Sequence, residues 1–149
     1  MCGFVGIVNY KKDISNYKEI LINMNNTLSK RGPDEDGYYI SQNVGLGHKR
    51  LIVIDPKGGK QPMVEKYTYG EYVIVYNGQI YNTKELRKTL EENNFEFTGH
   101  CDTEILLKSY IHYGKDVVNH LNGIFAFAIW NTKEQELFMA RDHFVVKPL

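Results

Sequence analysis

The chain has 149 residues, 42% of them hydrophobic, which suits one compact domain with its own core. Its 18 basic and 18 acidic side chains cancel, so charge gives no reason to expect nucleic acid or an anionic membrane as a partner. Cys2 and Cys101 are too few for the disulfide framework of a secreted domain, and the first residues lack the pattern of a signal peptide or membrane span. We therefore expect a cytoplasmic protein.

The first half of the chain predicts several short strands and one helix. Residues 3–9 are apolar and β-branched, which is typical of a buried strand. A helix is expected over residues 16–29, capped by Ser15, with its buried face formed by Ile20, Met24 and Leu28. Further strands are expected at residues 37–41, 45–54 and 72–76. Asn77-Gly78 is a hairpin signal between the last of these strands and residues 79–81.

The second half adds two helices and a hairpin. Residues 82–85 have capping-box spacing and predict a helix that buries Leu86 and Leu90. Residues 95–98 are a candidate strand, and a second helix is expected from Asp102 or Thr103 to residue 113, closed by Gly114. Residues 124–130 and 136–141 predict antiparallel strands joined by a polar turn. This pattern favours an α+β domain with helices packed outside antiparallel sheet.

Cys2 is a candidate nucleophile because removal of Met1 would make it the N-terminal residue. Cells commonly remove the initiator methionine when the next residue is as small as cysteine. The free α-amine would titrate near about 7.7–8.0 and could serve as the general base for the thiol of the same residue. A cysteine in second place also occurs by accident in exposed termini, so its position alone leaves both interpretations open.

Asn77-Gly78 has a chemical interpretation beside the hairpin one. Attack on a carboxamide builds negative charge on its oxygen, which an Asn side-chain amide and a Gly backbone N–H can stabilise. The dipeptide alone is compatible with both interpretations.

Arg50 and Asp102 form a third candidate element. Singly, each is compatible with a surface charge or a helix cap. Together they offer a guanidinium for an α-carboxylate and a carboxylate for an α-ammonium, the two charges of an amino-acid substrate. We interpret His48 as a packing or hydrogen-bonding residue and Cys101 as a small buried one. The His and Cys spacings predict no metal site.

Eight motifs follow one another in an order that covers nearly the whole chain. They are MCGFVGIV at 1–8, RGPD at 31–34, GHKRLIVID at 47–55, GGKQPM at 58–63, YNGQIYN at 76–82, GHCDTE at 99–104, LNGIFAFAIW at 121–130 and ARD at 140–142. In this order they resemble the N-terminal glutaminase domain of glutamine-hydrolysing asparagine synthetases, within the class II glutamine amidotransferases.

The resemblance implies a four-layer αββα N-terminal-nucleophile hydrolase sandwich of two antiparallel sheets. It implies hydrolysis of L-glutamine to glutamate and ammonia, with Cys2 as nucleophile and its α-amine as proton shuttle. It assigns the oxyanion to Asn77 and Gly78, the substrate carboxylate to Arg50, and the substrate ammonium to Asp102 and Gln79. The resemblance further implies a pocket wall, made by Leu51, Ile52, Val53 and Ile54, and a loop at residues 31–34 that orders the site.

The sequence departs from the family pattern at three places. Gln79 stands where the family usually has glutamate, so we expect weaker glutamine binding with the chemistry intact. Val145 stands where the family has glycine, and valine is strained there if the turn needs a positive φ. The chain stops at Leu149, where family domains continue with further strands and a synthetase domain. We therefore expect residues 1–149 to be a C-terminally truncated glutaminase domain, with a sheet edge open to homodimer formation.

The leading hypothesis is a glutaminase that supplies ammonia to a synthetase domain for asparagine synthesis. One alternative is the glutaminase domain of another class II amidotransferase. Another is a degenerate domain that folds and binds without catalysis. No cofactor is expected for the glutaminase domain, because ATP and magnesium belong, by resemblance, to the synthetase domain.

Overall fold

The computed structural model describes residues 1–53 and 58–149. In chain order the elements are β1 (Gly3–Val8), α1 (Lys18–Asn26), β2 (Glu35–Ile40), β3 (Val44–Arg50), β4 (Met63–Tyr67), β5 (Gly70–Ile80), α2 (Thr83–Glu92), α3 (Asp102–Tyr113), the 3₁₀ helix η1 (Gly114–Asn119), β6 (Gly123–Asn131) and β7 (Glu136–Arg141). The strands form a three-stranded sheet in the order β1-β3-β2 and a four-stranded sheet in the order β4-β5-β6-β7. All the strand pairs are antiparallel.

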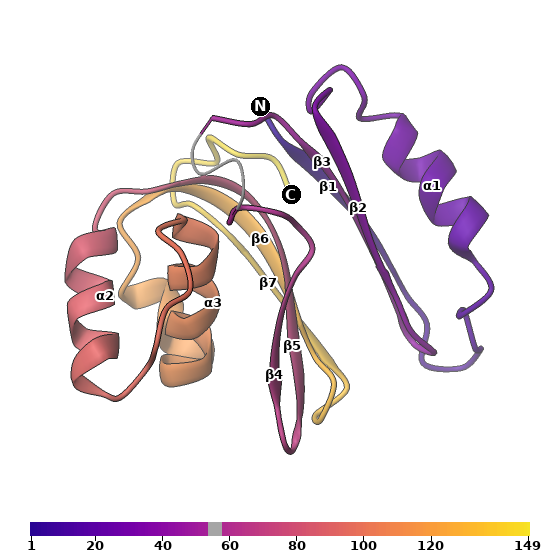
Figure 1. The fold of residues 1–149 in the computed structure, drawn as a ribbon. Helices are drawn as coiled ribbons and strands as arrows, with labels where there is room; N and C mark the ends of the chain where they lie inside the picture. The colour runs from indigo at the N-terminus through magenta and orange to yellow at the C-terminus, as the bar shows by residue number, and fades with distance from the viewer. Residues whose placement is uncertain (54–57) are drawn as a thin grey trace.

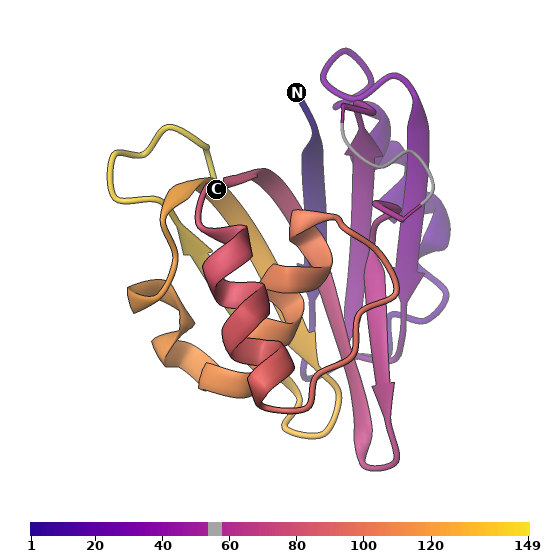
Figure 2. The ribbon, with the colours of Figure 1, turned by 60° about the vertical axis from the view of Figure 1, so that its left-hand side comes forward.

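The two sheets face each other, with helices on their outer faces (Figure 1). Helix α1 covers the three-stranded sheet, and α2 and α3 cover the four-stranded sheet, as the turned view also shows (Figure 2). This arrangement is a four-layer αββα sandwich, so the expected fold class is confirmed. None of the helices in the described part of the chain is long and apolar enough to cross a membrane.

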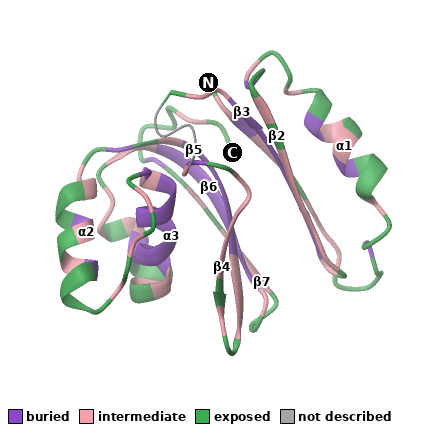
Figure 3. Cartoon of the chain, viewed as in Figure 1, coloured by how far each residue is buried: buried purple, intermediate pink, exposed green. Residues whose placement is uncertain are grey.

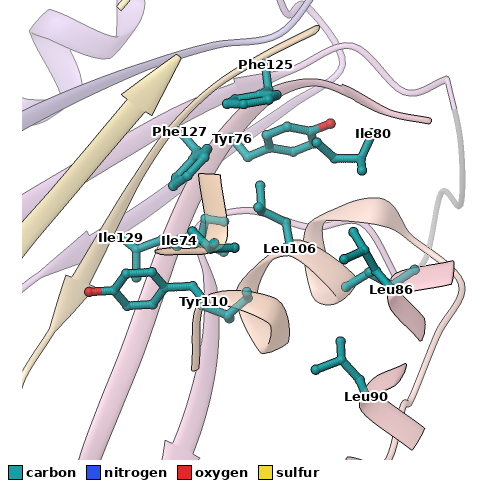
Figure 4. Close-up of a cluster of buried hydrophobic side chains, with 13 residues drawn as sticks. Ile74, Tyr76, Ile80, Leu86, Leu90, Leu106, Tyr110, Phe125, Phe127 and Ile129 are labelled. Atoms are coloured by element: carbon teal, nitrogen blue, oxygen red, sulfur yellow. The ribbon is translucent and has the colours of Figure 1, made fainter. Parts of the chain in front are cut away.

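Two hydrophobic clusters fill the spaces between the layers. One lies between the sheets and consists of Val44, Leu46, Val73, Val75, Ala128 and Trp130. The other joins the four-stranded sheet to α2, α3 and η1, and includes Tyr76, Leu86, Leu90, Leu106 and Phe127 (Figure 4). Buried residues accordingly concentrate on β3, β5, β6 and α3 (Figure 3). Side chains on β5 contribute to both clusters, so this strand is packed on both faces.

The predicted buried face of α1 is wrong by one position along the helix. Ile20 is 48% exposed, whereas Leu21 and Asn25 are fully buried. The reason lies on β3, where Gly45 and Gly47 have no side chains and so leave room for Leu21 and Asn25. A Cβ added at Gly45 would lie 3.4 Å from Leu21 Cδ2, and a Cβ added at Gly47 would lie 3.2 Å from Asn25 Cγ. The expected Ser15 cap is also wrong, because the helix begins after Tyr17 without a side-chain cap.

Asn77-Gly78 does not form a hairpin. Strand β5 continues through both residues, which pair with Ala126 and Phe125 of β6. A Cβ on Gly78 would lie 2.3 Å from the carbonyl oxygen of Ile124, so the glycine permits close approach of β6 rather than a turn.

The expectations for α2 and α3 are confirmed except for the capping box of α2. Helix α3 begins at Asp102 and ends before Gly114, as predicted, and α2 buries both Leu86 and Leu90. The capping box of α2 is not formed, because the Asn82 side chain instead bonds His120 O and Asn122 N.

Two strand assignments need correction. Strand β4 was not expected, and residues 95–98 are not a strand. The N–H groups of Thr98 and Gly99 donate to the Glu104 carboxylate, at 2.8 and 2.9 Å, and no strand forms there. The strand expected at residues 45–54 ends at Arg50 as β3; residue 54 lies outside the described residues.

The turn after β7 has the positive φ that would strain a valine at position 145. Val145 has φ 58°, and the Asp142 carboxylate organises the turn by accepting N–H bonds from Phe144, Val146 and Lys147 at 3.0–3.1 Å. A β-branched residue in this left-handed region is strained by about 1–2 kcal/mol. Val145→Gly is therefore expected to raise the melting temperature by about 2–4 °C, measured by calorimetry.

The matched control for this prediction is Val146→Gly. Val146 has the same 51% exposure as Val145 but is not among the residues with positive φ. Its replacement is expected to leave the melting temperature unchanged or lower it, because glycine adds entropy to the unfolded chain without relieving strain. Equal shifts in the two variants would remove the strain argument.

Candidate active site

A cavity of about 260 Å³ brings together segments that are far apart in sequence. The predicted site residues in its wall come from the start of the chain, the end of β3 and the residues after it, the second half of β5 and the first turn of α3. The cavity is lined by these residues of the predicted site: Cys2, Arg50, Leu51, Val53, Asn77, Gly78, Gln79 and Asp102. Ile52 does not line it, and the predicted Ile54 lies outside the described residues.

Cys2 precedes β1 and lies against the chain that leaves β3. The backbone N–H of Leu51 donates to the sulfur at 3.4 Å, and the thiol lies 3.6 Å from the carbonyl oxygen of the same residue. The loop at residues 31–34 bonds the backbone on both sides of this contact: Arg31 Nε donates to the Cys2 carbonyl at 3.3 Å, and Asp34 accepts from the N–H of Ile52, the residue after Leu51, at 2.8 Å. These contacts agree with the ordering role expected for this loop, and they give Ile52 a backbone role in place of a lining one.

Arg50 is the last residue of β3 and is only 5% exposed. Its Nη1 atom pairs with Glu35 Oε2 of the neighbouring strand β2 at 2.7 Å. Glu35 and Arg50 are direct partners in the antiparallel register, so the strand pairing itself places the two side chains together. The ion pair fixes the direction of the guanidinium at the cavity wall.

Asp102 opens α3 and is held by β5. Its Oδ2 atom accepts a hydrogen bond from the Tyr76 hydroxyl at 2.7 Å and a longer one from the Ile80 N–H at 3.4 Å. Burial and the nearby Asp102 carboxylate raise the pKa of Tyr76 far above its usual value, so the hydroxyl stays protonated and donates to Asp102. The carboxylate is thus directed toward the cavity by a permanent donor.

His48 is fully buried beside this arrangement and acts as a structural residue. Its Nε2 atom lies 3.1 Å from the Tyr76 carbonyl oxygen, which can only accept, so Nε2 carries the hydrogen. Burial lowers the pKa of His48 to about 4, so the ring is neutral at pH 7. The packing and hydrogen-bonding interpretation of His48 is confirmed. Cys101, 3% exposed, is likewise a small buried residue as expected.

Asn77 and Gly78 line the cavity from the second half of β5. Asn77 is only 6% exposed. Both residues are fixed by pairing with β6, so a rigid strand carries them. Gln79, the next residue, is exposed and lines the cavity together with Asp102.

The structure adds residues to the cavity wall that were not predicted. The most informative are Gln61, Tyr76, Thr103 and Lys147. Gln61 and Tyr76 stand inside the quoted motifs GGKQPM and YNGQIYN, which were the only signals that could have found them. Lys147 reaches the cavity because the Asp142 turn folds back on the start of the chain, where Lys147 Nζ lies 3.4 Å from Met1 Sδ.

The chemistry available at this cavity is that of a thiol, amides and paired charges. Within residues 1–53 and 58–149, no group of three or more His, Cys, Asp or Glu side chains is arranged to hold a metal ion. No histidine in the described part of the chain lines this cavity. A thiol, amide donors, a guanidinium and a carboxylate that line one cavity suit acyl transfer from an amino-acid carboxamide.

Comparison with known proteins gives consistent matches over the whole chain. A family model described as a glutamine amidotransferase domain matches residues 1–149. Glutamine-hydrolysing asparagine synthetase 3 of Bacillus subtilis is 49% identical over 148 residues, which are 99% of this chain and 24% of that protein. Asparagine synthetase B of Escherichia coli is 31% identical over 149 residues, 100% of this chain and 26% of that protein.

A solved structure supports the same fold. Glutamine phosphoribosylpyrophosphate amidotransferase from B. subtilis, in complex with ADP and GMP, superposes with a TM-score of 0.75 over 95% of this chain and 37% of that one. Its sequence identity is 19%, so the likeness concerns the fold alone.

The chain spans about a quarter of the length of the asparagine synthetases that it matches, in their N-terminal region.

Proposed function

Because the chain belongs to the glutamine amidotransferase family, as an enzyme domain similar to the N-terminal region of asparagine synthetases, we propose that it hydrolyses L-glutamine to glutamate and ammonia with Cys2 as its nucleophile. The observation that carries the proposal is the common cavity of Cys2, Arg50, Asn77, Gly78 and Asp102. These residues supply a nucleophile, an oxyanion site and both charges needed for an amino acid.

The first step is attack of the Cys2 sulfur on the side-chain carboxamide carbon of glutamine. The thiol proton passes to the α-amine of Cys2, which is available only after Met1 has been removed, because with Met1 present this nitrogen is a peptide amide. The Leu51 N–H donates to the Cys2 sulfur at 3.4 Å and holds it at the cavity. No histidine is required for this step.

The tetrahedral intermediate carries its negative charge on the former carbonyl oxygen. The Asn77 side-chain amide and the Gly78 backbone N–H are the donors that we assign to this oxygen. Collapse of the intermediate breaks the C–N bond, and the protonated α-amine gives its proton to the leaving group, which departs as ammonia. Water, deprotonated by the same amine, then cleaves the thioester and releases glutamate.

Recognition of the amino-acid end is assigned to the charged residues that line the same cavity. Arg50, oriented by Glu35, binds the substrate carboxylate. Asp102, oriented by Tyr76, binds the ammonium. The side chains of Leu51 and Val53 cover the aliphatic part of the substrate, while residue 54 is outside the described chain.

The ammonia acceptor is proposed from similarity. The matched relatives are named as glutamine-hydrolysing asparagine synthetases, and the chain corresponds to 24% of the length of asparagine synthetase 3 of B. subtilis. We infer that the ammonia serves asparagine synthesis in a synthetase domain, to which ATP and magnesium also belong.

A combined mass and product assay tests the proposal. Intact mass reports whether Met1 is absent, and the Met1-free protein is expected to release glutamate and ammonia in equal amounts from L-glutamine. A glutamine analogue without the α-amino group is expected to react poorly, because Asp102 would lose its partner. A folded, Met1-free protein that releases neither product would favour the degenerate, non-catalytic alternative.

The glutamine at position 79 leads to a separate prediction. Gln79 lines the cavity beside Asp102 but offers the substrate ammonium only a neutral acceptor. Gln79→Glu is expected to lower KM for glutamine about twofold to fivefold, a small effect because the side chain is exposed. The kcat should stay the same, since the ammonium is remote from the reacting carboxamide. A KM that does not move would remove Gln79 from the ammonium site.

A further inference from the structure

Gln61 precedes β4, and its side chain bonds two segments that are distant in sequence. The Tyr76 N–H donates to Gln61 Oε1 at 2.6 Å, and Gln61 Nε2 donates to Thr103 Oγ1 at 3.3 Å. Main-chain pairing of β4 with β5 begins at Met63, opposite Ile74, so the Gln61 side chain receives an N–H of β5 beyond the end of that ladder. One side chain therefore connects β5 with α3 at the cavity wall.

The backbone of Gln61 makes a third connection, to the opposite sheet. A Cβ on Gly37 of β2 would lie 1.7 Å from the Gln61 carbonyl oxygen, so only glycine lets the two segments pack this closely. Gln61 also lines a neighbouring cavity of about 370 Å³ that includes Gly37. It thus stands where the three-stranded sheet, the four-stranded sheet and α3 meet.

Tyr76 connects Gln61 to Asp102, the residue of the proposed ammonium site. Its N–H is held by Gln61, its carbonyl oxygen by His48, and its hydroxyl donates to Asp102 at 2.7 Å. The ring is packed beside Phe125 and Ile80 (Figure 4). Because all the polar groups of Tyr76 are engaged, loss of the Gln61 bond leaves a buried N–H unsatisfied and loosens the residue that orients Asp102.

We propose that Gln61 is a positioning residue for substrate recognition, holding Tyr76 and the first turn of α3 in the relative placement at which Asp102 meets the substrate ammonium. The inference rests on the proposed glutaminase function and adds to it a residue that acts through Tyr76 and Thr103. The oxyanion donors depend less on Gln61, because Asn77 and Gly78 are fixed by their pairing with β6. Loss of Gln61 therefore acts on KM and much less on kcat.

The test uses two variants, each of which removes one partner of the hydrogen bond between Gln61 and Thr103. Gln61→Met keeps the length of the side chain and removes its amide, and Thr103→Val keeps the shape of threonine and removes its hydroxyl. Gln61→Met is expected to raise KM for glutamine about tenfold, the effect of one lost hydrogen bond, with kcat changed less than about twofold. Thr103→Val is expected to act in the same direction and to provide the test if Gln61→Met does not fold.

A double-variant cycle separates positioning from general destabilisation. Tyr76→Phe removes the hydroxyl that orients Asp102 and is itself expected to raise KM. If Gln61 acts through Tyr76, adding Gln61→Met to Tyr76→Phe raises KM by clearly less than the product of the single effects. Hydrogen exchange of the Tyr76 amide should also be faster in Gln61→Met than in the wild type.

Ser109→Ala is the matched control in the same helix. The Ser109 hydroxyl is fully buried and bonds Ile105 O at 2.8 Å, away from the cavity, so this variant should lower the melting temperature and leave KM unchanged. An unchanged KM in Gln61→Met, or single effects that multiply in the double variant, would overturn the inference while leaving the glutaminase proposal intact. An inactive, Met1-free wild type would overturn both.

Discussion

Cys2→Ala is expected to reduce glutamine hydrolysis by at least about 10³-fold, because the thioester intermediate forms on the Cys2 sulfur. Alanine is also small, so removal of Met1 should proceed as in the wild type. The fold should persist, since the Cys2 side chain is only partly buried and the contacts that its thiol loses, with the Leu51 backbone, are long, at 3.4 and 3.6 Å. Release of ammonia, measured together with intact mass and melting temperature, checks the prediction.

Cys101→Ala is the control for this loss of activity. Cys101 is the other cysteine of the chain and also lines the cavity, but it is 3% exposed, and its thiol faces the Gly58 carbonyl oxygen at 3.5 Å. Its variant should keep most of kcat. A thiol-alkylating reagent should likewise inactivate Cys101→Ala and leave Cys2→Ala unmodified. Equal activity of Cys2→Ala and the wild type would remove Cys2 as the nucleophile.

Asn77→Ala is expected to lower kcat about 10²-fold to 10³-fold, with a much smaller change in KM. The Asn77 amide is assigned to the oxyanion, whose charge exists only in the transition state and the intermediate, so its loss acts on kcat and kcat/KM alike. Steady-state kinetics on the folded variant measure both constants. An increase confined to KM would mean that Asn77 binds ground-state substrate instead.

Asn131→Ala provides a matched comparison on the neighbouring strand. Asn131 is 8% exposed, close to the burial of Asn77, but its side chain accepts N–H bonds from Lys133 and Glu134 in the turn after β6, away from the cavity. This variant should lose stability by about 1 kcal/mol and retain kcat. A similar fall in kcat for both variants would attribute the effect of Asn77→Ala to strand distortion.

Most of the candidate site could be predicted from the sequence, through the order of its motifs. Cys2, Arg50, Gln79 and Asp102 line one cavity as that order implied. Their partners were not predictable in the same way: Glu35 meets Arg50 through the register of β2 with β3, and Gln61 meets Thr103 across 42 positions of chain. Such contacts depend on how layers pack, a property that no local pattern encodes.

Among the strands and helices, too, some features could be predicted from local sequence patterns and others depend on packing between layers. Local patterns determined α3, β6 and β7, where burial period, a closing glycine and a polar turn agree with one another. The tertiary structure decided the buried face of α1, because Gly45 and Gly47 on β3 leave space only where Leu21 and Asn25 project. It also kept β5 continuous at Asn77-Gly78, since hydrogen bonding to β6 outweighs the local turn preference of that dipeptide. The sequence by itself thus determined which chemical groups the chain carries, whereas packing between layers decided which of those groups face one another.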